Sequence, residues 1–130
     1  INAKSGASLD GSDDYRNELN GMGYIVEADP YDKNRIAKKR TALGRYAHES
    51  AAFGPVTAGQ PLAVYMGDDA RNEYIYKFVS TATWQTADAT ASDRIATGDK
   101  YLDDGKLYTA KFNSDGTGEW VELNLSLIHI

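Results

Sequence analysis

Cysteine is absent from the 130 residues of this chain. Without cysteine the chain can form no disulfide, no thiolate zinc site and no thiol nucleophile, so a metal bound by it would need oxygen or histidine ligands. Long hydrophobic runs are also missing, because no stretch reaches the roughly 18 apolar residues of a membrane-spanning helix. The sequence contains no glycine-rich phosphate loop and no nucleophile elbow, which argues against ordinary triad chemistry.

The charge balance is acidic, with 14 Lys and Arg against 19 Asp and Glu and a net charge of -5. This balance argues against nucleic-acid binding, which depends on cationic contacts to phosphates, but acidic chains can hold hard cations. With 42% hydrophobic and 25% charged residues, the composition is typical of a folded unit and not of a disordered tail. Because Ile1 opens the chain without Met or a signal peptide, we expect a segment internal to a longer protein.

Short apolar segments separated by Gly, Pro and Asp predict a set of β-strands. The segments with strand character are residues 24–29, 46–53, 62–66, 73–79, 107–112 and 119–123. The turns at 67–69 and 113–118 predict two hairpins. The region 80–100 is polar, and no segment shows a convincing amphipathic helical pattern. The sequence therefore predicts an all-β fold, and its pattern leaves a sandwich, a barrel and a propeller open.

The densest polar cluster is MGDDARNE, residues 66–73, at the join of two predicted strands. If this part is already extended, the two-residue spacing places Arg71 and Glu73 on the same face. A guanidinium beside a carboxylate could then hold an oxyanion next to a bound metal. The alternative, favoured by spacing alone, is an Asp-rich turn followed by a surface ion pair.

Two further acidic positions are candidate ligands. Glu27 and Asp29 share a strand face, where they repel each other unless a metal or a nearby Arg or Lys lies between them; the alternative is a solvated edge strand. His48 and Glu49 are adjacent and point to opposite faces of a strand, so at most one enters a given site, and we favour Glu49.

Four segments, taken in order, resemble the PhoX-type alkaline phosphatases. They are GYIVEADPYD (23–32), KRTALGRYAHE (39–49), VYMGDDARNEYIYKFVS (64–80) and LDDGKLYTAKFNSDGTGEWVEL (102–123). The resemblance covers nearly all of residues 15–123. It implies a six-bladed β-propeller in which calcium and ferric iron lie at one end of the central channel. It also implies a monomeric periplasmic or secreted enzyme that hydrolyses phosphate monoesters and, to some extent, diesters.

Carried over by position, the resemblance makes Glu27 and Glu73 metal ligands and Arg71 the residue that binds the substrate phosphate. Glu49, Asp68 and Asp69 match motif positions and are possible metal ligands or supports of the ligands. The family takes one iron ligand from a cysteine, which this chain lacks. A non-catalytic binding or structural propeller of the same family is the alternative function.

A propeller blade needs about 40 to 50 residues, so we expect this chain to supply about three of six blades and to be inactive alone. We expect residues 1–124 to be an incomplete propeller domain. The last six residues, LSLIHI (125–130), resemble the translation of the end sequence of transposon-based sequencing libraries. They are therefore predicted to be an adapter-derived tail.

Overall fold

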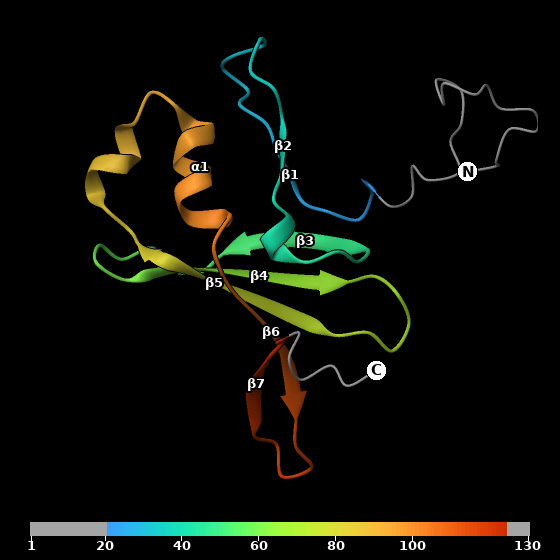
Figure 1. Cartoon of the computed structure of the whole chain (residues 1–130). Coiled ribbons are helices and arrows are strands. Elements are labelled where there is room, and N and C mark those ends of the chain that lie inside the picture. Colours follow the sequence, from blue (N-terminus) through green and yellow to red (C-terminus); the bar gives the residue numbers. More distant parts are fainter. Residues whose placement is uncertain (1–20, 125–130) are drawn as a thin grey trace, which may run out of the picture.

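The computed structural model describes residues 21–124 and is mostly antiparallel sheet with one α-helix (Figure 1). One sheet holds five strands in sequential order: β3 (His48–Phe53), β4 (Pro61–Asp68), β5 (Ile75–Thr83), β6 (Gly105–Phe112) and β7 (Gly118–Glu122). A separate ladder pairs β1 (Val26–Glu27) with β2 (Lys38–Lys39). The helical elements are η2 (Thr41–Leu43), η3 (Thr86–Thr90) and α1 (Arg94–Leu102). No helix within residues 21–124 is long and apolar enough to cross a membrane.

The two hairpins predicted from the sequence are confirmed as β4–β5 and β6–β7. Alternation along β4 buries Leu62, Val64 and Met66, which are 5%, 2% and 2% exposed. Opposite them, Val64 pairs with Phe78 of β5, which is fully buried. The period of two in the sequence therefore selects the face of the sheet that carries the core.

The core is formed by Leu43, Val64, Met66 and Phe78. Figure 1 shows β1, β2 and α1 on the same side of the sheet, where they cover this core. The opposite side carries large apolar side chains that are 38% to 75% exposed, and we call it the outer face. The outer face consists of Tyr65, Ile75, Phe112 and Trp120.

Helix α1 contradicts the expectation that residues 80–100 contain no helix. The Asp93 side chain caps the helix by accepting a hydrogen bond from the Ala96 N–H at 2.9 Å. Its buried stripe is narrow, because it consists only of Ile95, Gly98 and Tyr101. A glycine and a tyrosine give a weak hydrophobic period, so the pattern of side chains did not predict the helix.

The estimate of three blades is too high for the described residues, which form a single five-stranded sheet and a two-stranded ladder. The difference arises because residues 28–37 and 84–104 belong to loops and helical turns and not to strands. The all-β expectation therefore holds for the sheet, and one helix is added to it. The predicted tail, residues 125–130, lies outside the described residues.

Candidate functional site

The loop between β4 and β5, residues 69–74, carries three of the six site residues predicted from the sequence: Asp69, Arg71 and Glu73. Its start is fixed by two hydrogen bonds: the Ala70 N–H donates to Asp68 Oδ1 at 3.0 Å, and the Asp69 N–H donates to the Ala47 carbonyl at 2.9 Å. Asn72 has a φ of 64°, a left-handed conformation that asparagine tolerates better than most residues. The sequence after β4 therefore makes a tight loop tied to the start of β3.

Arg71 lies in the turn of this loop, and β5 begins only at Ile75. The segment is therefore not extended, and the strand geometry that would place Arg71 and Glu73 on one face does not apply. Both side chains are exposed, and neither forms a hydrogen bond or ion pair with another residue in the range 21–124. The surface ion pair expected as the alternative is therefore not formed between them. A guanidinium and a carboxylate are left facing solvent, two residues apart.

An aromatic stack lies beside the loop. The ring of Tyr46 stacks on His48 with centroids 3.7 Å apart and on Tyr76 with centroids 4.2 Å apart. Burial raises the pKa of Tyr46 well above its ordinary value, and the charges of Tyr76 and Asp68 add to this effect. Burial likewise raises the pKa of Tyr76, with a further contribution from the carboxylate of Glu73. Both phenols therefore stay protonated and neutral next to acidic residues.

A hollow of about 270 Å³ opens next to this stack. Glu49 and Asp69 line it together with Tyr24 and His48. The Nε2 atom of His48 lies 3.2 Å from the Gly44 carbonyl oxygen, and its Nδ1 is buried without a hydrogen-bond partner. The hollow thus brings together two of the predicted carboxylates, Glu49 and Asp69. His48 and Glu49 both line it, although adjacent residues of a strand were expected to face opposite sides.

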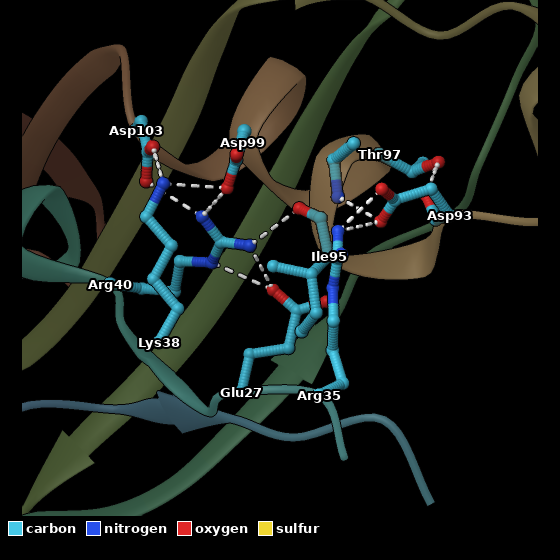
Figure 2. Close-up of polar contacts among 10 residues, drawn as sticks. Glu27, Arg35, Lys38, Arg40, Asp93, Ile95, Thr97, Asp99 and Asp103 are labelled. Carbon is cyan, nitrogen blue, oxygen red and sulfur yellow. Dashed lines mark hydrogen bonds and ion pairs between the residues drawn. The ribbon is translucent and has the colours of Figure 1, made fainter. Parts of the chain in front are cut away.

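Glu27 belongs to a different cluster, which is centred on the fully buried side chain of Arg40 (Figure 2). Oε2 of Glu27 accepts a hydrogen bond from Arg40 Nε at 2.7 Å and forms an ion pair with Nη2 at 2.5 Å. The remaining donors of Arg40 reach the helix. Nη1 lies 2.7 Å from Asp99 and 2.8 Å from Asp103, and Nη2 donates to the Ile95 carbonyl at 3.0 Å. This guanidinium therefore joins the β1–β2 ladder to α1.

Lys38 strengthens the same connection. Its Nζ lies 2.6 Å from carboxylate oxygens of both Asp99 and Asp103. The cations of Lys38 and Arg40 hold the pKa of Asp99 below its ordinary value. Burial of Asp103 disfavours its charged form, but hydrogen bonds from Lys38 and Arg40 outweigh this effect and lower its pKa as well. Both aspartates therefore remain ionised at neutral pH.

The face shared by Glu27 and Asp29 is neutralised by arginines. Glu27 pairs with Arg40, and Asp29 Oδ2 lies 3.4 Å from Arg94 Nη1. Arg35 pairs with the helix cap Asp93 beside them (Figure 2). Of the two neutralising groups that the sequence left open, a metal or a nearby basic side chain, the structure shows the basic side chains.

The predicted site residues fall into two groups. The first group surrounds the β4–β5 loop, and its members are Glu49, Asp68, Asp69, Arg71 and Glu73. The second is Glu27, whose side chain points to α1; no hydrogen bond or ion pair joins it to Arg71 or Glu73. Within residues 21–124, no three His, Asp or Glu side chains are grouped so that they could hold a metal ion.

Sequence reasoning missed Arg40, Asp99 and Asp103. Arg40 ends a basic run that predicts a solvated turn, yet its side chain is 0% exposed. The four-residue spacing of Asp99 and Asp103 puts both on one helix face. This spacing is informative only if the segment is helical, and the sequence pattern did not predict the helix.

Comparison with known proteins connects this geometry to a family. The family described as alkaline phosphatase PhoX matches residues 3–127 of the chain. The chain belongs to the PhoX family. A solved structure of Pseudomonas fluorescens PhoX, in complex with vanadate, a transition state analogue, is 41% identical in sequence, with a TM-score of 0.68. No curated protein matches the chain.

The match to the P. fluorescens PhoX covers 83% of this chain but 19% of that one. The chain therefore spans about a fifth of the length of a solved PhoX protein. The PhoX family resemblance read from the sequence motifs is confirmed.

Proposed function

We propose that this chain is a segment of a PhoX-type, metal-dependent phosphatase that hydrolyses phosphate monoesters and, less readily, diesters. In this proposal the segment is part of a β-propeller, and the full-length protein is a monomer that acts in the periplasm or outside the cell to acquire phosphate. The segment contributes residues to a site that other parts of the full-length protein complete.

The observation that carries the proposal is the 41% identity to a PhoX protein solved with vanadate, over 83% of this chain. The geometry of the β4–β5 loop supports it. Arg71 is exposed and is not committed to an ion pair with any described residue. Its guanidinium is free to bind a ligand.

Arg71 would bind the phosphoryl group of the substrate. A guanidinium presents its N–H donors in a planar fork that matches two phosphoryl oxygens, and its charge persists at alkaline pH. Donors placed where negative charge develops stabilise the transition state more than the ground state. Asn72, in its left-handed conformation, and the tether from Asp69 to Ala47 fix the backbone on either side of Arg71.

Glu27 and Glu73 would contribute carboxylate ligands for calcium and iron, with Glu49, Asp68 and Asp69 as further candidates. The donor chemistry fits, because these hard cations take oxygen ligands. It fits only as a partial contribution, since no three suitable side chains are grouped within residues 21–124. When bound, the metals would supply positive charge that offsets the charge of the phosphoryl oxygens.

Hydrolysis of p-nitrophenyl phosphate by the full-length protein tests this function. We expect activity that a chelator abolishes and that calcium and ferric iron restore. We expect Arg71→Ala to lower kcat/KM about 100- to 1,000-fold, the usual cost of removing one donor to a developing oxyanion. Full-length protein without phosphatase activity would instead favour the non-catalytic propeller.

Arg94→Ala provides the matched control. Arg94 is also an exposed arginine, and its single ion pair with Asp29 is long, at 3.4 Å. It lies on α1, away from the β4–β5 loop. Its replacement should leave kcat/KM within about twofold of the wild-type value, and undiminished activity of Arg71→Ala would refute the role given to Arg71.

A further inference from the structure

The Arg40 cluster consists of Arg40, Lys38, Glu27, Asp99 and Asp103. The contact of Arg40 with Glu27 is not needed to attach α1. We infer that Arg40 is a positioning residue that fixes the carboxylate of Glu27 so that one of its oxygens faces a hard cation. This inference rests on the proposed function, in which Glu27 is a metal ligand. It assigns to Arg40 a role in metal affinity that the ion pairs with the helix alone would not give it.

The contacts of Arg40 with Glu27 are unevenly distributed over the two carboxylate oxygens. Nε of Arg40 donates a hydrogen bond to Oε2 and Nη2 forms an ion pair with the same oxygen, whereas Oε1 accepts no hydrogen bond from any residue in the described part of the chain (Figure 2). An arginine that serves only as an ion-pair partner commonly binds both carboxylate oxygens in a fork. Here one oxygen is fully engaged, and the lone pairs of the other remain available.

The surroundings hold Glu27 in place and still leave it accessible. A Cβ on Gly98 would lie 2.2 Å from both Glu27 Oε2 and Arg40 Nη2, so α1 closes on the pair from one side. The side chain of Glu27 nevertheless remains 27% exposed. A ligand carboxylate held by a buried donor and open on one side is the usual arrangement around protein metal sites.

The net charge of the cluster also favours a cation at Glu27. Lys38 and Arg40 contribute two positive charges, and Glu27, Asp99 and Asp103 contribute three negative charges. One negative charge is therefore left over around a buried guanidinium. The neighbouring pairs Arg35–Asp93 and Arg94–Asp29 are each balanced and do not supply the missing positive charge. A cation at Oε1 of Glu27 would neutralise the cluster.

Calcium titration calorimetry on chelator-treated full-length protein tests the inference. Glu27→Gln identifies the binding event to which Glu27 contributes. We expect Arg40→Lys, which keeps the charge but loses the fork, to weaken that event about 10- to 100-fold, as loss of a hydrogen-bonding support typically does. In a Glu27→Gln background, Arg40→Lys should have no further effect on calcium affinity.

Arg35→Lys is the matched control, because it keeps the charge, alters the ion pair that attaches the helix cap Asp93 and leaves the contacts of Arg40 with Glu27 in place. Its calcium affinity should stay within about twofold of wild type. Equal losses in Arg40→Lys and Arg35→Lys, or no loss in Arg40→Lys, would show that Arg40 only anchors the helix. If Glu27→Gln binds calcium as wild type does, the ligand role of Glu27 fails and the positioning role with it.

Gly98→Ala gives a second route if Arg40→Lys does not yield folded protein. It retains every charge but displaces Glu27 and Arg40, because the new methyl group overlaps both. Reduced calcium affinity of folded Gly98→Ala supports the inference, and unchanged affinity overturns it. Circular dichroism establishes in each case that the titrated protein is folded.

Discussion

Gly98 is the residue at which α1 comes closest to the buried guanidinium of Arg40. The helix reaches this distance only because position 98 has no side chain, since a Cβ there would approach Arg40 Nη2 and Glu27 Oε2 to 2.2 Å. Glycine inside a helix costs up to about 1 kcal/mol relative to alanine. Helix propensity disfavours glycine at position 98, but the close approach of Arg40 and Glu27 leaves no room for a larger residue.

We expect Gly98→Ala to lower the free energy of unfolding of the chain by about 1 to 2 kcal/mol. Overpacking costs about 1 to 3 kcal/mol, which exceeds the gain in helix propensity of up to about 1 kcal/mol. Urea denaturation followed by circular dichroism measures the change. Gly67→Ala is the control, because its Cβ would lie 3.8 Å from Glu49 Cβ, an ordinary contact. Equal stability of the Gly98→Ala and wild-type chains would contradict the geometry.

At the scale of the element, α1 and the turn η3 before it are attached mainly by charged side chains. Arg35 binds the capping Asp93, Lys38 and Arg40 bind Asp99 and Asp103, and Lys100 binds Asp88 of η3 at 2.7 Å. Apolar packing adds Ile95 and Tyr101, whose ring lies 5.1 Å from that of Trp84. An element held in this way should respond to pH more strongly than the sheet.

The pKa values of Asp88, Asp93, Asp99 and Asp103 all lie below the ordinary 3.8, and the causes include basic partners in every case. A lowered pKa in the folded state stabilises the fold fully above pH 3.8, and this stabilisation is lost as the pH falls through the lowered values. We therefore expect α1 to detach below about pH 4, before the sheet unfolds.

Trp84 fluorescence in a Trp120→Phe background measures this detachment, because Trp84 packs on Tyr101 of the helix. The fluorescence change should precede loss of the sheet signal in infrared spectra. The variant Asp99→Asn/Asp103→Asn should already show part of the change at neutral pH. Simultaneous loss of both signals would mean that ion pairs do not govern the attachment of α1.

At the scale of the whole molecule, the outer face of the five-stranded sheet is not covered by any other described element. Tyr65, Ile75, Phe112 and Trp120 are 40%, 48%, 75% and 38% exposed. Two of them, Tyr65 and Trp120, have ring centroids 6.0 Å apart and so form one patch. Contiguous exposed apolar surface of this kind marks an interaction site or an aggregation hazard. Within residues 21–124, β3 and β7 are the edge strands and add backbone groups that no neighbouring strand pairs.

We expect the 130-residue chain to self-associate in solution through the outer face. The double substitution Ile75→Thr/Phe112→Ser should reduce the associated fraction several-fold in sedimentation velocity. Ile36→Ser serves as the control, because Ile36 is 85% exposed but lies in the β1–β2 connection and not on the outer face. A monomeric wild-type chain at concentrations of tens of micromolar would count against this prediction.

Most of the sheet could be predicted from the sequence. Alternation of apolar and polar residues located β4, β5, β6 and β7 to within a few residues, and the glycine- and aspartate-rich turns located both hairpins. The helix was missed because Ile95, Gly98 and Tyr101 make a weak apolar period. The number of blades was overestimated because loops and helical turns occupy much of the chain. Of the site, the Asp-rich turn between β4 and β5 was predicted as the alternative that spacing favours, but the ion pair expected with it between Arg71 and Glu73 is not formed.

The sequence by itself determined the strands, the hairpins and, through four ordered motifs, the family. These features depend on residues close together in the chain, where spacing is a sufficient guide. Only the tertiary structure decided that Arg40 is buried and that its guanidinium contacts both Glu27 and α1. Asp99 is 59 positions from Arg40, and no local pattern encodes which charges meet over that distance. Folding the β1–β2 ladder against α1 brings them together, because a buried guanidinium is tolerated only where carboxylates and a carbonyl satisfy its donors.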